Sequence, residues 1–118
     1  MPMGEQERFM ALVAEALDAL PDWVHGALDN VEVLVDDHPP EGVEPNTLGL
    51  YEGIPLTERG ADYTGVLPDR ITLFAMPIAA EAGPEPEVLK RVIGETVVHE
   101  IAHHFGIDDE RLHEIDRY

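Results

Sequence analysis

The sequence contains no cysteine, few basic residues and no long hydrophobic run. Without cysteine the chain can form no disulfide, zinc knuckle or thiol nucleophile, and this composition suits a reducing compartment such as the cytoplasm. Only 7 Lys and Arg stand against 25 Asp and Glu, which gives a formal net charge of −18. Such a chain repels phosphate backbones, so we expect no nucleic-acid partner, and its surface favours cations or basic peptides.

The hydrophobic residues are too interrupted for a membrane segment. No stretch approaches the ~20 apolar residues of a membrane span. The first 20 residues have no basic start, and acidic residues interrupt their apolar positions, which is not the pattern of a signal peptide. We therefore expect a soluble cytoplasmic protein without a membrane partner. Its 118 residues fit one domain, 1–118, which should bury roughly 65% of its unfolded surface.

Helical and extended patterns alternate along the chain. Apolar residues recur at helical spacing between Glu5 and Leu20, whereas short β-branched runs predict strands. Residues 53–69 show no periodicity, and loops of this length are often functional. In chain order, we expect a helix over 5–20, a short helical turn over 22–28, strands over 31–35, 47–52 and 70–75, a long helix over 85–105 and a last short helix over 108–117.

The most informative motif is His99-Glu100-Ile101-Ala102-His103, which continues through Gly106 to Asp109. It has the form HExxHxxGxxD. On an α-helix, residues four apart lie on one face, so two imidazoles at this spacing can bind one metal ion. A glutamate beside the first histidine can reach a water on that ion. The motif therefore predicts a zinc site with a general base next to it.

The helix that carries the motif should have two different faces. Ile93, Val97 and Ile101 share one face, and the two motif histidines point away from it. This pattern predicts an apolar face toward the core and a histidine-bearing face toward a cleft. His104 falls near the apolar side, so we expect a packed, hydrogen-bonded histidine there. Glu95 lies four residues after Arg91, where a surface ion pair is expected.

The third zinc ligand is expected just past the helix end. Gly106 can adopt a left-handed conformation that reverses the chain and returns Asp109 to the two imidazoles. Two histidines, one carboxylate and a water would complete a tetrahedral zinc site, with Glu100 as general base. Two alternatives remain open: Asp109 caps the last helix without binding metal, or Asp108 is the ligand.

These residues, together with Leu48-Gly49-Leu50-Tyr51-Glu52-Gly53, 55–60 and 67–71, resemble the minimal zincin-like metallopeptidases of bacteria. The motif is also similar to that of the Asp-zincins, in which two His and one Asp bind zinc and Glu acts as base. By position, the resemblance implies zinc bound by His99, His103 and Asp109, with Glu100 as the catalytic residue. It implies an α+β fold, with a small mixed β-sheet packed against a long active-site helix, plus N- and C-terminal helices.

The resemblance also implies a substrate and leaves one role open. An extended peptide or unfolded protein segment would pair with an edge strand of the sheet. The metzincins share the glycine turn, but their third ligand is a histidine where this chain has Asp109. They also have a methionine-containing turn downstream, and this sequence shows no such turn after Asp109. Larger relatives supply a side chain that stabilises the oxyanion. The candidates for that role here are Tyr51, Arg59, Tyr63 and His113.

Three functions are compatible with the motif. The leading one is a zinc-dependent metallopeptidase that hydrolyses peptide bonds by a Glu100-activated water. The alternative is a metal-binding module without proteolysis, although a purely structural site would need no base at Glu100. The third is a zinc endonuclease of the ribosomal RNA maturation class, which typically has glycine after the first histidine. The glutamate here and the net charge of −18 argue against that class.

Overall fold

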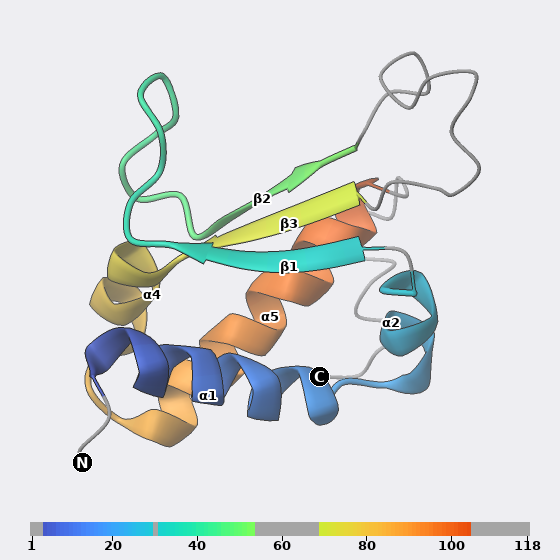
Figure 1. Cartoon of the computed structure of the whole chain (residues 1–118), viewed down its shortest axis with the longest axis horizontal. Helices are drawn as coiled ribbons and strands as arrows, with labels where there is room; N and C mark the ends of the chain where they lie inside the picture. The colour runs from blue at the N-terminus through green and yellow to red at the C-terminus, as the bar shows by residue number, and fades with distance from the viewer. Residues whose placement is uncertain (1–3, 30, 54–68, 105–118) are drawn as a thin grey trace.

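The structure, a computed structural model, describes residues 4–29, 31–53 and 69–104 (Figure 1). Its strands form one three-stranded mixed sheet in the order β1-β3-β2. The central strand β3 (Asp69–Phe74) pairs in parallel with β1 (Val31–Asp36) and antiparallel with β2 (Gly49–Glu52). Within the described part of the chain, β2 is therefore an edge strand, with only one side paired.

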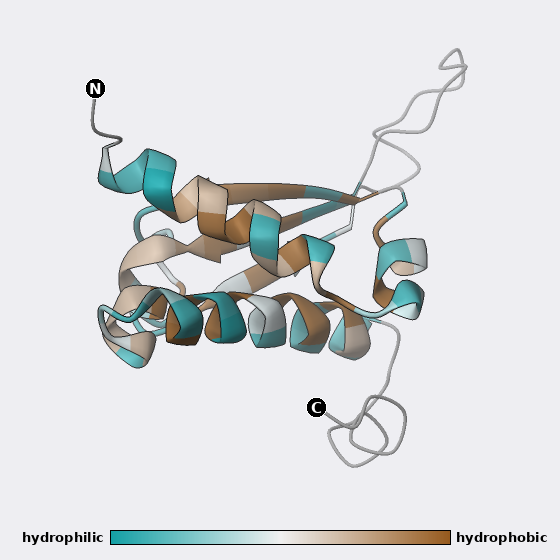
Figure 2. Cartoon of the chain, turned by 90° about the horizontal axis from the view of Figure 1, so that it is seen from below, coloured by the Kyte–Doolittle hydropathy of each residue, from teal (hydrophilic) through white to brown (hydrophobic). Residues whose placement is uncertain are grey.

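Four helices accompany this sheet in the described residues. They are α1 (Glu5–Asp18), α2 (Asp22–Ala27), α4 (Ala75–Ala82) and α5 (Pro86–His104). The long helix α5 contacts β2, β3, α1 and α4, and so it links the sheet to the other helices. Figure 2 shows α1 and α5 as neighbouring helices, each with alternating hydrophobic and hydrophilic positions. None of the helices in these ranges has the length and apolar character needed to cross a membrane.

The apolar face predicted for the motif helix forms the centre of the core. Ile93, Val97 and Ile101 are each 0% exposed, and they pack in one cluster with Ile71 and Leu73 of β3. Helix α1 adds its own buried apolar face to the same cluster. Because one face of α5 is fixed against the core, its opposite face must carry the motif histidines outward.

The expected α+β fold with a small mixed sheet is confirmed. The structure confirms the helices expected over 5–20, 22–28 and 85–105 and the three expected strands. Their described ends differ from the expected ends by no more than two residues. One assignment was wrong at its end: Ala75 begins α4 and does not close the third strand. The last helix over 108–117 and nearly all of the loop over 53–69 lie outside the described residues.

Helix α4 was not predicted from the sequence. Its eight residues, AMPIAAEA, are mostly small or apolar, so they show little contrast between a buried and an exposed face. Pro77 stands in its first turn, where a missing N–H is tolerated. Only Ile78 is fully buried, and it packs in the core together with the partly buried Ala75 and Ala82.

Candidate metal and catalytic site

Helix α5 brings His99 and His103 onto one face, as the motif predicts. The centroids of their rings are 6.2 Å apart, with the ring planes at 48°. Zinc–nitrogen bonds of about 2 Å in a tetrahedron would set the two centroids at about 5 Å. Side-chain rotation can supply this difference of about 1 Å because His103 is exposed and His99 is only half-buried. The two side chains therefore fit a shared metal ion.

A hydrogen bond orients the first of these histidines. Nδ1 of His99 lies 2.8 Å from the carbonyl oxygen of Glu95, one helical turn earlier. A nitrogen that donates to a carbonyl carries the ring proton, so the neutral ring keeps its lone pair on Nε2. Metal-binding histidines commonly have such a partner, which fixes both the tautomer and the ring direction. His99 thus has the orientation of a ligand that binds through Nε2.

Glu100 lies between helix and sheet, where the edge strand holds it. Its Oε1 accepts a hydrogen bond of 3.1 Å from the backbone N–H of Tyr51 in β2. Burial raises the pKa of the Glu100 carboxyl, while the Tyr51 bond and the charges of His103 and His99 oppose that rise. A carboxylate with a raised pKa accepts a proton more readily, as a general base must. Sequence spacing gave no signal for this contact across the fold.

Tyr51 makes two further contacts through its side chain. Its hydroxyl donates a 2.8 Å hydrogen bond to Oδ2 of Asp69, and its ring stacks on His104 with centroids 3.9 Å apart. The expectation that His104 packs into the apolar side was wrong, because this histidine is exposed and lies against Tyr51. In the last turn of α5, Ile101 and Ala102 are buried in the core, whereas His104 lies on the exposed side next to the edge strand. The Tyr51 hydroxyl, proposed for the oxyanion, already donates to Asp69.

The third predicted ligand falls beyond the part of the chain that the structure describes. Asp109, its alternative Asp108 and the turn residue Gly106 lie outside the described residues, as do the oxyanion candidates Arg59, Tyr63 and His113. Across residues 4–29, 31–53 and 69–104, no three metal-binding side chains cluster. The described site therefore contains two histidine donors and a neighbouring carboxylate.

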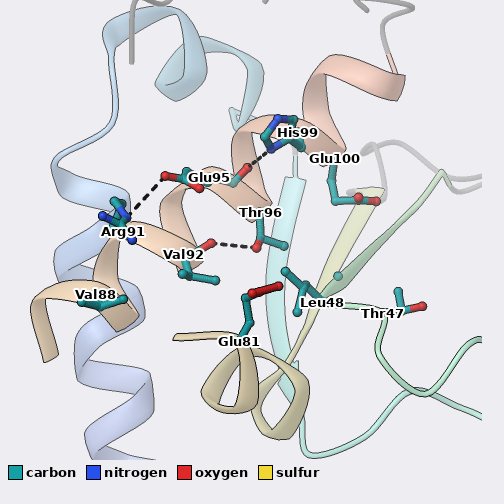
Figure 3. Close-up of a pocket in the computed structure, with 11 residues that line it drawn as sticks. Thr47, Leu48, Glu81, Val88, Arg91, Val92, Glu95, Thr96, His99 and Glu100 are labelled. Carbon is teal, nitrogen blue, oxygen red and sulfur yellow. Dashed lines mark hydrogen bonds and ion pairs between the residues drawn. The ribbon is translucent and has the colours of Figure 1, made fainter. Parts of the chain in front are cut away.

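A pocket of about 480 Å³ extends from His99 and Glu100 along α5 (Figure 3). His99 and Glu100 lie at one end of it, and Thr96 and Val92 follow one and two turns further back on the helix. The Thr96 hydroxyl donates to the carbonyl oxygen of Val92 at 2.7 Å, which fixes its methyl group toward the strand. The other lining residues come from β2, α4, α5 and the segment before β2: Thr47, Leu48, Gly49, Glu81, Val88, Arg91 and Glu95.

Gly49 lets the strand approach the helix at this pocket. A Cβ at this position would lie 2.8 Å from Cγ2 of Thr96 and 3.3 Å from the carbonyl oxygen of Thr72. Real Cβ atoms do not approach other atoms at 2.8 Å, so a larger residue would push β2 away from α5. The glycine therefore sets the distance between the edge strand and the motif helix.

The unpaired side of β2 faces this pocket. The N–H of Phe74 donates to the carbonyl of Leu48 at 2.9 Å, which defines one hydrogen-bonded pair of the β2–β3 ladder. Such pairs alternate along antiparallel strands, so Gly49 and Tyr51 point their backbone groups away from β3. The bond from Tyr51 to Glu100 agrees with this alternation. Among the described residues, an edge strand whose outer backbone groups are not paired with another strand thus runs beside the motif.

A model of the zincin-like metallopeptidases matches residues 28–118. The chain belongs to this family. The matched range includes the motif, the edge strand and the pocket between them. The assignment agrees with the resemblance drawn from the sequence and makes this zincin-like chain a possible metallopeptidase scaffold.

A solved structure shares the fold. It is described as a conserved hypothetical protein from Thermus thermophilus, with 26% sequence identity and a TM-score of 0.55. The match covers 94% of this chain and 99% of that chain. A search of curated proteins gave no match.

Proposed function

We propose that this zincin-like protein is a zinc-dependent peptidase that acts on extended peptides or unfolded segments in the cytoplasm. The observation that carries the proposal is the position of His99 and Glu100 at the end of a pocket, with His103 beside His99 on the same helix and β2 as the edge strand of the described sheet. Family membership supports it, because zincin-like metallopeptidases use such a motif for metal and base.

The proposed ligands are His99, His103 and Asp109, the set of an Asp-zincin. The proximity of His99 and His103 and the orientation of His99 support a shared ion. When bound, zinc supplies a Lewis acid that polarises the substrate carbonyl and makes water acidic. An aspartate ligand leaves a smaller formal charge on the site than a third histidine would. More of the activation of water then rests on Glu100.

Glu100 would take the proton of the attacking water and later give it to the leaving amine. Its half-buried position and raised pKa support this role, because the carboxylate must hold a proton between the two steps. The Tyr51 N–H keeps one carboxylate oxygen in place. The second oxygen, Oε2, would then accept the proton of the reacting water.

The substrate would lie along the outer side of β2 as an added strand. Gly49 and Tyr51 present outward-facing backbone groups for such pairing. An antiparallel substrate runs from the Glu52 end of β2 toward Gly49, so it passes the motif before the pocket. The residue after the cleaved bond therefore enters the pocket.

The test is to compare wild type with Glu100→Gln, each loaded with zinc, on a diverse library of unstructured peptides. Both proteins should bind zinc, but only wild type should cleave, because an amide cannot accept the proton. Chelator should abolish cleavage and added zinc should restore it. If zinc-loaded wild type cleaves none of the peptides, the metal-binding module without proteolysis becomes the better description.

A further inference from the structure

The pocket beside His99 combines apolar walls with the carboxylate of Glu81, an exposed residue near the end of α4. Leu48, Val88 and Val92 contribute aliphatic surface, and Thr96 turns its methyl group toward the same space. Figure 3 shows the carboxylate of Glu81, from the end of α4, projecting toward the pocket between these side chains. The pocket thus has walls suited to an aliphatic stem and an acceptor suited to its polar tip.

The charges that line this pocket are unbalanced. Glu81, Glu95 and Glu100 contribute carboxylates, whereas Arg91 is the one cation among the lining residues that the structure describes. Arg91 already pairs with Glu95 at 3.6 Å, and Glu100 accepts from the backbone of Tyr51. Glu81 makes no ion pair with any residue in the described ranges. Its charge is therefore available to an incoming group.

We propose that this pocket selects lysine or arginine at the residue that follows the cleaved bond, with Glu81 as the specificity-determining residue. This inference rests on the proposed function for the direction of the substrate. Long basic side chains bury an aliphatic stem and keep a charged tip at a polar partner, which matches the walls and the carboxylate. A leucine or methionine would cover Glu81 without giving it a partner, and an acidic residue would be repelled.

The first experiment measures binding, so that it does not depend on cleavage. Zinc-loaded Glu100→Gln protein is titrated into fluorescent Ala/Ser peptides that differ at one central position, which carries lysine, norleucine, glutamine or glutamate. Norleucine has the lysine stem without the ammonium group. We expect the lysine peptide to bind about tenfold more tightly than the norleucine peptide at low salt, as for a charge-assisted contact. The preference should shrink as salt is added.

Variants of Glu81 then locate the preference. Glu81→Gln, in the same Glu100→Gln background, should bring lysine and norleucine peptides to equal affinity, and Glu81→Lys should favour the glutamate peptide. Glu85→Gln removes the same charge from an exposed position outside the pocket and should keep the lysine preference. Circular dichroism and thermal melts confirm that each variant is folded.

Cleavage by wild type separates this inference from the proposed function. We expect cuts before lysine or arginine, and loss of that preference in Glu81→Gln. Lysine-selective binding that depends on Glu81, with no cleavage of any peptide, would support the pocket and remove the peptidase proposal. Cleavage without a preference for basic residues would overturn the pocket assignment but not the peptidase proposal. A basic preference that is the same in wild type and Glu81→Gln would have the same consequence. Equal binding of all four peptides to the Glu100→Gln protein would also overturn it.

Discussion

The backbone N–H of Tyr51 and Oε1 of Glu100 are joined by a 3.1 Å hydrogen bond across 49 residues of sequence. This bond ties the edge strand to the carboxylate that the motif predicts as general base. It also places Glu100 at the strand edge where we propose that substrate pairs. Strand position and base position are thus coupled, and a change that moves β2 should also move Glu100.

The proposed metal site can be tested by measuring the zinc content of the protein. We expect about one zinc per chain in protein prepared without chelator, and no zinc in the His99→Ala His103→Ala double variant. His25→Ala is the matched control, because His25 is exposed on α2 and is no part of the motif. Elemental analysis of the three proteins gives the answer. Undiminished zinc in the double variant would remove His99 and His103 as ligands.

Asp109 can be separated from its capping alternative by two substitutions. If it is a ligand, Asp109→Asn should weaken zinc binding by more than the roughly 10- to 100-fold typical of residues that merely support a ligand. Asp108→Asn should leave zinc affinity nearly unchanged. If Asp109 instead caps a helix, Asp109→Ala should lower the free energy of unfolding by about 1 kcal/mol without metal. Competitive zinc titration and thermal melts without metal distinguish these roles. If Asp108→Asn lowers zinc affinity more than Asp109→Asn does, Asp108 is the third ligand.

Gly49 should be sensitive to a single added methyl group. Gly49→Ala places Cβ against Cγ2 of Thr96, so we expect the free energy of unfolding to fall by about 1–3 kcal/mol. Thr96→Ser keeps the hydroxyl that donates to Val92 and removes that Cγ2. The double variant should therefore recover part of the loss. Urea unfolding of the four proteins in a double-mutant cycle measures the coupling, and purely additive effects would contradict this contact.

Stability at high pH should depend on Tyr51. Burial, and then the hydrogen bond to Asp69, raises the pKa of Tyr51 from 10.0 to about 12. Because the folded state holds the Tyr51 proton more tightly than the unfolded state does, protonated Tyr51 stabilises the fold, in full below pH 10. This contribution is lost as the pH rises toward 12. Tyr51→Phe should therefore show a smaller loss of unfolding free energy over this range than wild type. Denaturant unfolding at several pH values checks this, and parallel curves for the two proteins would refute it.

The sequence predicted those features that depend on spacing within one helix. The period of Ile93, Val97 and Ile101 placed the core face, and it thereby placed His99 and His103 opposite. The expected ion pair of Arg91 with Glu95 is confirmed at 3.6 Å for the same reason. Contacts inside one helix follow from its geometry, so a sequence pattern is sufficient to find them.

Contacts between elements were not accessible in this way. His104 was misplaced because helical spacing alone does not show that Tyr51 of a separate strand lies beside it. The bond between Tyr51 and Glu100 depends on the register of β2. Glu81 lines the pocket because it lies on α4, a helix that the sequence pattern did not predict. The contacts proposed to hold a substrate depend on packing between elements, whereas the proposed histidine ligands depend on the spacing within one helix.

The shortness of β2 would limit how the proposed peptide substrate is held. Its four residues turn the backbone groups of only Gly49 and Tyr51 outward, and the Tyr51 N–H is already bonded to Glu100. This leaves an N–H and two carbonyls, and each such hydrogen bond contributes only about 0.5–1.5 kcal/mol net. Main-chain pairing of this extent would orient a peptide without retaining it. Affinity would then have to come from contacts with the side chains of the peptide. Such a peptidase would select particular peptide sequences and would not degrade proteins indiscriminately.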